Sequence, residues 1–210
     1  MNEVEEAMSK KTMSITVAVA ALISSPVLAD AGDWLLRARL IHIDANSSSD
    51  AGGPLGLPAD AVKVGDRLGA DLDISYFFTD NIAAELVLTY PQRHKVTLNG
   101  ADIGAVKHIP PTLVLRYHFP IGRTFKPYVG AGVNLTVFTD RTLLNGLAKL
   151  ERTSFGPAVQ LGLDYAIDKH WSLNVDVKKI FINSDVEVAG VGKATELDID
   201  PWVYGVGYRY

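Results

Sequence analysis

The chain has 210 residues, of which 48% are apolar and 21% are charged, and its formal net charge is −4 with histidine neutral. This composition excludes a wholly disordered chain, and the lack of a basic surplus argues against nucleic acid as a partner. The absence of cysteine excludes disulfides and thiolate sites, and beyond residue 30 no apolar run approaches the roughly 20 residues of a membrane-spanning helix.

The first 29 residues have the order of a secretory signal peptide. Lys10 and Lys11 precede an apolar stretch at 13–23, and small residues lead to Ala29, after which we expect cleavage. The acidic segment 1–7 does not suit a basic leader, so Met8 is an alternative start to Met1. A membrane anchor is the competing interpretation, but the apolar stretch is shorter than a span. Residues 30–210 are then the mature domain.

The mature chain alternates apolar and polar residues in segments rich in β-branched and aromatic side chains. Eight strands are predicted, at residues 34–44, 67–78, 82–90, 111–119, 125–138, 154–167, 171–181 and 195–210. Three short turns alternate with four long loops, at residues 45–66, 91–110, 139–153 and 182–194. This pattern is typical of an all-β, eight-stranded antiparallel up-and-down transmembrane β-barrel.

Alternation alone does not say which face meets lipid, because a secreted lipocalin-like barrel keeps its apolar face inward. Aromatic residues separate the two interpretations. The first group, near the short turns and the mature termini, is Trp34, Phe78, Phe119, Phe125, Tyr128, Tyr165, Trp171, Tyr208 and Tyr210. The second group, near the long loops, is Tyr90, Phe138, Phe155, Phe181 and Trp202. Two such belts are typical of the two membrane interfaces, which predicts a location in the bacterial outer membrane.

The opposite face of the predicted strands carries charges of both signs. These residues are Arg37, Arg39, Asp71, Asp73, Glu85, Arg116, Asp164, Asp176, Lys178 and Arg209. Eight strands enclose a lumen that side chains can just fill. Because an unpaired charge there costs several kcal/mol, we expect a neutral charge plug and no wide aqueous channel. Asp198 and Asp200 share the outward parity of Trp202, so either they lie above the hydrocarbon or Pro201 shifts the register.

Several short stretches occur in a characteristic order along the mature chain. They are Gly32-Asp33-Trp34, Asp80-Asn81-Ile82, Tyr90-Pro91 through His94-Lys95, Pro110-Pro111-Thr112-Leu113, Pro127-Tyr128-Val129-Gly130-Ala131-Gly132, Asp200-Pro201-Trp202 and Tyr208-Arg209-Tyr210. In these stretches the chain resembles the OmpW family of small outer-membrane proteins, which includes alkane-uptake members. The resemblance implies an eight-stranded barrel whose extracellular loops form an apolar pocket for small hydrophobic molecules, which leave sideways into the outer leaflet. It also implies that Tyr210, where the family commonly has Phe, contacts the barrel-assembly machinery.

A sideways exit needs an interruption of the wall, and proline lacks the N–H that a β-ladder uses. Pro91 follows the third predicted strand, and Pro110 and Pro111 begin the fourth, so we expect a lateral opening between these strands. Alternatively, the prolines simply end the strands. We expect apolar loop residues to line the pocket, although they could equally pack on one another or rest on lipid. These residues are Leu55, Leu57, Val62, Leu143, Leu144, Leu147 and Leu150.

The sequence therefore predicts a non-enzymatic barrel for passive uptake of small hydrophobic molecules, with no catalytic residue and no cofactor. The expected partners are membrane lipid, lipopolysaccharide and hydrophobic solutes. The histidines lack metal-binding spacing; His94 and His108 flank one loop and could meet, although mobile surface histidines are the simpler expectation. Two alternatives remain. One is a structural or receptor protein that contacts lipopolysaccharide, phage or bacteriocin, and the other is a lipid A acylase or deacylase with histidine and serine or acidic partners at the outer rim.

Overall fold

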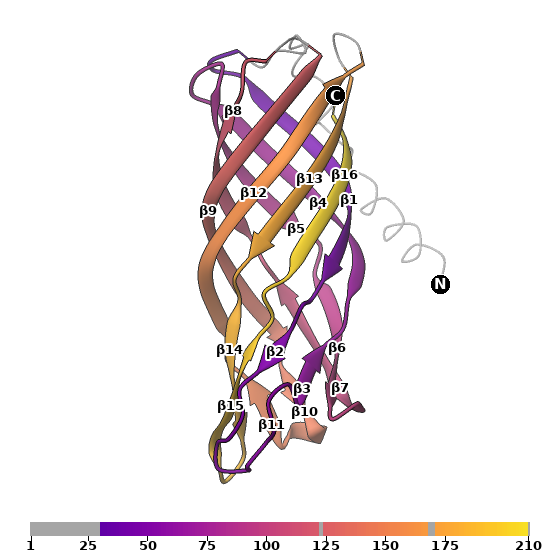
Figure 1. Ribbon diagram of the computed structural model, residues 1–210, viewed down its shortest axis with the longest axis vertical. Coiled ribbons are helices and arrows are strands. Elements are labelled where there is room, and N and C mark those ends of the chain that lie inside the picture. Colours follow the sequence, from indigo (N-terminus) through magenta and orange to yellow (C-terminus); the bar gives the residue numbers. More distant parts are fainter. Residues whose placement is uncertain (1–29, 122–123, 168–170, 210) are drawn as a thin grey trace, which may run out of the picture.

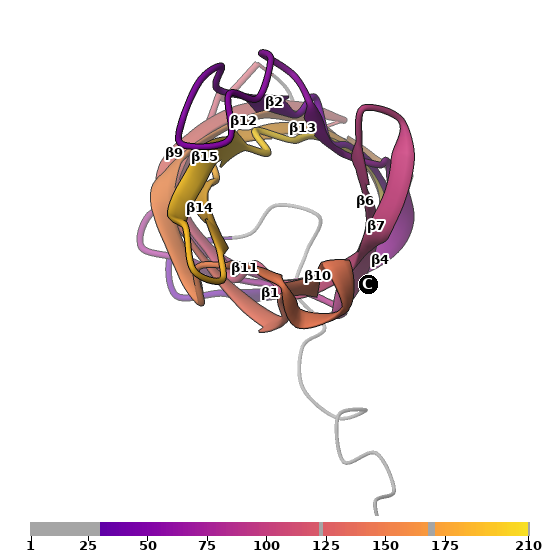
Figure 2. The ribbon, with the colours of Figure 1, turned by 90° about the horizontal axis from the view of Figure 1, so that it is seen from below.

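A computed structural model describes residues 30–121, 124–167 and 171–209, and the predicted signal peptide lies outside them. Eight long strands form a barrel: β1 (Trp34–Asp44), β4 (Arg67–Phe77), β5 (Ile82–Thr89), β8 (Thr112–His118), β9 (Phe125–Asp140), β12 (Thr153–Ala166), β13 (Ser172–Ile180) and β16 (Trp202–Arg209). Each pairs antiparallel with the next, and β16 returns to β1, so the sheet has no free edge in the barrel (Figures 1 and 2). The predicted eight-stranded barrel is confirmed.

The four connections that the sequence predicts as long loops contain regular secondary structure. They contain β2 (Ser48–Ser49), β3 (Val62–Val64), β6 (Gln92–Leu98), β7 (Ala101–Ile109), β10 (Thr142–Leu143), the 3-10 turn η1 (Leu144–Gly146), β11 (Ala148–Leu150), β14 (Asn183–Val188) and β15 (Gly192–Asp198). These elements continue the wall below the barrel in Figure 1, at what we call the long-loop end. The Asn99-Gly100 pair, with φ of 50° and 83°, is the typical turn of a tight hairpin and was the available signal for β6 and β7.

The last predicted strand, 195–210, is two strands. β15 ends at Asp198 and β16 begins at Trp202, with Pro201 between them. Leu197, Ile199 and Val203 are all buried, so the inward alternation continues across the break and Pro201 does not shift the register. Asp200 accepts a hydrogen bond at Oδ1 from the backbone N–H of Ile182 at 3.1 Å. Asp198 and Asp200 thus lie on the long-loop side of β16. Of the two alternatives, this favours a position above the hydrocarbon over a shift of register at Pro201.

The inner and outer faces of the barrel differ sharply in chemistry. Arg37, Asp73 and Glu85 are fully buried inside, whereas Leu72 and Leu86 on the neighbouring outward positions are 40% and 38% exposed. A wall of exposed aliphatic residues around a polar interior is the pattern of a barrel surrounded by hydrocarbon. Within the described ranges, no helix has the length and apolar character needed to cross a membrane.

Two aromatic residues depart from the predicted belts. Trp34, Phe78 and Phe155 are more than half exposed on the outer face, as expected of belt residues. Tyr128 and Phe138, by contrast, are buried inside the barrel. Both lie on β9, where Val129, Val133 and Leu135 are the exposed outward positions, so the even-numbered residues of this strand point inward. Tyr210 lies outside the described residues.

Candidate functional site

The interior of the barrel is crossed by a network of ion pairs. The structure places nine of the ten predicted plug residues there, all buried: Arg37, Arg39, Asp71, Asp73, Glu85, Arg116, Asp164, Asp176 and Lys178. The side chain of Arg209 lies outside the part that the structure describes. The register explains the meeting of these side chains, because β1 and β4 set Arg37 opposite Asp73 and Arg39 opposite Asp71.

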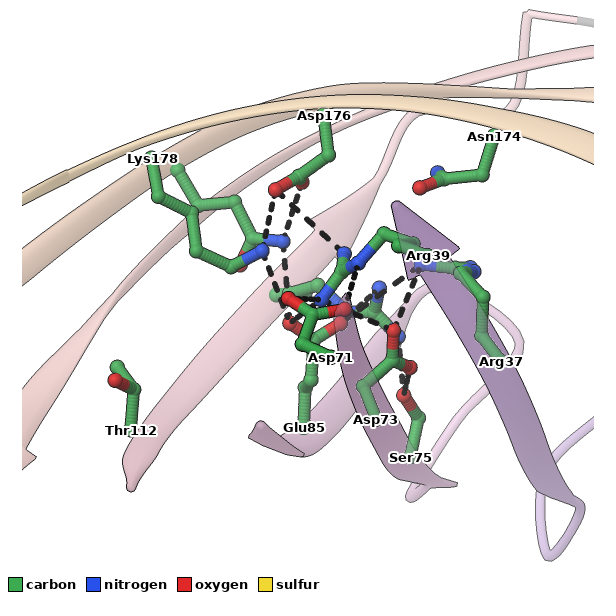
Figure 3. A network of polar contacts seen from close by, with 12 residues as sticks. Arg37, Arg39, Asp71, Asp73, Ser75, Glu85, Thr112, Asn174, Asp176 and Lys178 are labelled. Atoms are coloured by element: carbon green, nitrogen blue, oxygen red, sulfur yellow. Dashed lines mark hydrogen bonds and ion pairs between the residues drawn. The ribbon is translucent and has the colours of Figure 1, made fainter. Parts of the chain in front are cut away.

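Arginine and lysine side chains contact carboxylates directly in this charge plug. Arg39 donates from Nε to Asp71 Oδ1 at 2.8 Å and its Nη2 lies 3.1 Å from Asp73 Oδ2. Arg116 Nη1 lies 2.5 Å from Glu85 Oε2, and Lys178 pairs with Asp176. Figure 3 shows Arg39 among carboxylates of opposite walls. Paired charges of this kind are stable in a low-dielectric interior only while each keeps its partner.

Neutral polar groups complete the plug. The Tyr128 hydroxyl donates to Asp176 Oδ2 at 2.8 Å, and the Asn174 amide donates to the same hydroxyl at 3.0 Å and to Asp164 at 2.9 Å. Tyr128 was assigned to an aromatic belt from the sequence, but it is a central residue of the plug. A Cβ at Gly162 would overlap the ring of Tyr128, so this glycine leaves the space that the ring occupies. The plug therefore fills the lumen from wall to wall.

An apolar chamber lies between the plug and the long-loop end. A cluster of buried aliphatic residues surrounds it, including Ile41, Ile43, Ile180 and Val203 from the barrel strands. A cavity of about 30 Å³ opens in this chamber. Its lining residues are Ile41, Ile43, Asp71, Val87, Thr89, His108, Pro110, Thr112, Lys178, Ile180, Ile182, Pro201 and Val203. Asp71 and Lys178 belong to the plug, which thus forms the floor of the chamber.

The structure divides the predicted pocket residues into two groups. Val62, Leu143 and Leu150 are buried in the apolar cluster, and Leu144 packs against it half-buried. Leu55 and Leu147 are 49% and 63% exposed, and Leu57 is intermediate. The first group therefore belongs to the apolar cluster, whereas Leu55, Leu57 and Leu147 are not among its residues.

The wall beside the chamber contains an unpaired stretch. Pairing of β5 with β8 ends at Val87 and Thr112, and the next cross-strand pair in this direction is Gln92 with His108, on β6 and β7. Between them, residues 88–91 and 109–111, all described, form no ladder with one another. At about 3.3 Å per residue, the interval from Val87 to Gln92 is about 16 Å of wall. Pro91, Pro110 and Pro111 all lie in this stretch and supply no backbone N–H to close it.

Asn134 of β9 holds the edge of this stretch in place. Its Nδ2 donates to the carbonyls of Pro110 and Pro111 at 3.2 Å each and to Thr112 Oγ1 at 2.9 Å. The side chain therefore ties the start of β8 to β9, away from β5. Sequence reasoning missed Asn134, because an inward asparagine on a predicted strand carries no sign of which strand it will bind.

His94 and His108 meet inside the long-loop end, against the simpler expectation of mobile surface histidines. Both are buried, and their rings stack with centroids 5.0 Å apart. The Nδ1 of His94 lies 2.7 Å from the carbonyl oxygen of Gly65. Burial lowers the pKa of His94, and burial lowers the pKa of His108 to about 3 with a smaller contribution from His94. Among the described residues, no three His, Asp or Glu side chains are grouped to hold a metal ion.

Comparison with known proteins assigns the chain to a family. A sequence profile of the OmpW family matches residues 30–210. The chain belongs to the OmpW family. An outer-membrane protein of Sinorhizobium fredii is 40% identical over 210 aligned positions, which cover 92% of this chain and 89% of that protein.

Solved structures in and around the OmpW family are similar in fold. The crystal structure of the outer-membrane protein OprG from Pseudomonas aeruginosa has a TM-score of 0.76 at 31% identity, covering 88% of this chain and 98% of OprG. The solid-state NMR structure of the outer-membrane protein AlkL in DMPC lipid bilayers has a TM-score of 0.68 at 28% identity, covering 90% of this chain and 93% of that one. AlkL of Ectopseudomonas oleovorans is also 29% identical in sequence, over 85% of this chain and 82% of that protein.

Membership of the OmpW family settles three of the predictions. The chain is an outer-membrane barrel, its exposed apolar wall lies in the lipid bilayer, and it is not an enzyme. The lipid A acylase or deacylase is thereby excluded. The predicted roles of Tyr210 in assembly and of lipopolysaccharide as a partner stay predictions.

Proposed function

We propose that this barrel takes up small hydrophobic molecules passively, through an apolar loop pocket and with lateral release into the membrane. The observation that carries the proposal is the lining of the cavity. Val87 and Thr89 come from one edge of the unpaired wall stretch, and His108, Pro110 and Thr112 come from the other. The chamber and the unpaired stretch are therefore neighbours, so a solute in the chamber has lipid a short distance away.

The charge plug gives the path its direction. An apolar solute cannot replace the partners of Arg39 or Glu85, so moving through the plug would leave charges unpaired at a cost of several kcal/mol. Hydrocarbon just outside the wall is a favourable solvent for the same solute. The route of lowest free energy therefore leads sideways, between β5 and β8.

Entry requires the apolar cluster to part, because the cavity of about 30 Å³ is close to the size of one water molecule. Val62, Leu143 and Leu150 close the chamber by dispersion contacts. An apolar solute can replace such contacts with similar ones of its own, whereas a polar solute cannot. The resemblance to a family with alkane-uptake members supports the same substrate class.

The exit is tested by restoring N–H groups at the unpaired stretch. The double variant Pro110→Thr, Pro111→Val removes both prolines next to Thr112. The N–H restored at 110 faces β5, where continued pairing would meet Thr89, whereas residue 111 already faces β9, since its carbonyl accepts from the N–H of Leu135. We expect it to reduce uptake of an apolar fluorescent probe by vesicles with lipopolysaccharide in the outer leaflet. Pro120→Thr, in an exposed turn at the opposite end of the barrel, is the matched control and should leave uptake unchanged.

The entrance is tested by a pair of leucines on one loop. Leu143→Asp puts a charge into the buried cluster, whereas Leu147→Asp puts the same charge on a 63% exposed position. Uptake should fall in the first variant and persist in the second. A heat-modifiability gel checks that both variants still fold into closed barrels. If the unaltered protein takes up no more probe than protein-free vesicles, the conduit is rejected in favour of a structural or receptor role involving lipopolysaccharide, phage or bacteriocin.

A further inference from the structure

The chamber contains a buried polar atom without a protein partner. His108 is 5% exposed and lines the cavity, and its Nδ1 makes no hydrogen bond within the described part of the chain. Leaving a buried hydrogen-bonding atom unsatisfied is unfavourable, so this nitrogen, in a residue that lines the cavity, is a candidate partner for a ligand that enters when the apolar cluster parts.

The other strongly polar groups around the cavity are already occupied. Asp71 accepts from Arg39 at 2.8 Å, and Lys178 pairs with Asp176 in the charge plug. Thr112 donates to the Pro110 carbonyl at 3.1 Å and accepts from Asn134. The cavity therefore offers no free charge to an ionic ligand, while His108 Nδ1 remains without a partner among the described residues.

The imidazole of His108 is held in a defined position. It stacks on His94 on one side, and the ring of Phe138 lies tilted with its centroid 5.6 Å away. His94 is in turn fixed by its contact with the carbonyl of Gly65. A ring that is packed in this way is pre-organised, so a hydrogen bond to a ligand costs little additional ordering. Burial also disfavours its charged form, which leaves a neutral nitrogen at pH 7.

We propose that the chamber prefers amphiphiles, that is, an apolar body carrying one neutral hydrogen-bonding group such as a hydroxyl, which pairs with His108 Nδ1. The cavity of about 30 Å³ lies against His108, and it must widen as the apolar cluster parts before a hydroxyl can reach this nitrogen. Ile41, Ile43 and Ile180 surround the apolar part. This inference rests on the proposed uptake function and narrows its substrates from hydrocarbons to hydrocarbons with a single polar head.

The test compares dodecane with 1-dodecanol, which differ by one hydroxyl. Uptake of each radiolabelled compound is measured with the full-length protein in vesicles that carry lipopolysaccharide in the outer leaflet. His108→Leu should lower protein-dependent uptake of 1-dodecanol about fivefold to tenfold, the usual effect of losing one neutral hydrogen bond, and change dodecane uptake less than twofold. His108→Gln, which keeps a neutral hydrogen-bonding group, should restore part of the 1-dodecanol uptake.

A second histidine provides the matched control. His42 is exposed on the outer face, stacked on Tyr204, so His42→Leu should leave both uptakes unchanged. Equal loss of both compounds in His108→Leu, or no loss of 1-dodecanol, overturns the preference for amphiphiles while the uptake function stands. If the unaltered protein transports neither compound above protein-free vesicles, the uptake function itself fails and this inference with it.

Discussion

At the scale of single residues, Glu85 is where the cations of the interior converge. Its carboxylate lies 2.5 Å from Arg116 and 3.8 Å from both Arg37 and Lys178. Arg37 comes from β1, Arg116 from β8 and Lys178 from β13, so the carboxylate of Glu85 on β5 neutralises charges that three other strands bring together. The Glu85 carboxylate therefore stabilises the plug. Without its negative charge, these cations would repel one another in an interior that screens charges poorly.

We expect Glu85→Gln to lower the free energy of unfolding by about 3–5 kcal/mol, because it leaves buried cations without their counter-charge. The midpoint of urea unfolding in lipid vesicles measures the change. Glu187→Gln, on an exposed position of β14, is the control and should shift the midpoint little. Equal midpoints for the two variants would contradict the role assigned to Glu85.

Glycines adjacent to the plug provide a second prediction at this scale. A Cβ at Gly207 would overlap Cγ of Arg39, and one at Gly162 would overlap the Tyr128 ring. Either change to alanine should destabilise the barrel by about 1–3 kcal/mol through overpacking. At Gly65 the nearest atom to an added Cβ is the Lys95 carbonyl oxygen at 3.7 Å, so Gly65→Ala should be tolerated. The same urea series distinguishes them, and a Gly207→Ala barrel as stable as Gly65→Ala would refute the packing argument.

At the scale of elements, the β6–β7 hairpin is the part of the wall that borders the unpaired stretch. It pairs with β3 on one side and, through Lys107, His108 and Ile109, with β9 on the other. Its inner face carries His94 and His108, which are buried together. The backbone ladders attach the hairpin, and because the two histidines are buried between its neighbours, we expect their protonation to weaken this attachment.

The pKa values of His94 and His108 lie below the ordinary value near 6.5, because burial disfavours the charged ring. The opened hairpin then binds protons more strongly than the closed one. Attachment should be complete above about pH 6.5 and weaken as the pH falls, with no further loss below about 3 for His108. Hydrogen-exchange protection of Val96 and Val106 should accordingly decrease from pH 7 to pH 4.5.

Two comparisons make this pH effect specific. Amides of β13 and β16, which pair with none of β3, β6, β7 and β9, should keep their protection over the same range. The double variant His94→Leu, His108→Leu should lose the dependence, although Arg67 and Asp66 remain near the first position. A pH dependence that persists in the double variant would assign the effect to those neighbouring charges.

At the scale of the whole molecule, closure of the barrel and filling of its interior act together. The eight strands pair in a ring, so no edge is left to fray, and ion pairs cross the lumen from Arg37 on β1 to Asp164 on β12 at 3.0 Å. A structure with these cross-links opens only when many contacts are lost at once.

We therefore expect the extracted protein to migrate differently on detergent gels before and after boiling, because the closed barrel resists detergent until heated. Glu85→Gln should shift the conversion to a lower temperature, whereas Glu187→Gln should not. Identical mobility of the unaltered protein before and after boiling would contradict a closed barrel.

Apolar and polar residues alternate with a period of two along each strand, and this pattern is local. The sequence alone therefore determined the eight strands of the barrel and the inner position of residues such as Arg37, Asp73 and Glu85. The OmpW resemblance was visible because it, too, rests on short local stretches of sequence. Tertiary structure decided the rest. Tyr128 and Phe138 turn inward because of the parity of β9, the four long loops become sheet because distant hairpins pair, and Asn134 meets Pro110 only through the register of β8 on β9. His94 and His108 are buried because β3, β6, β7 and β9 enclose them, and no residue near them in sequence reveals this.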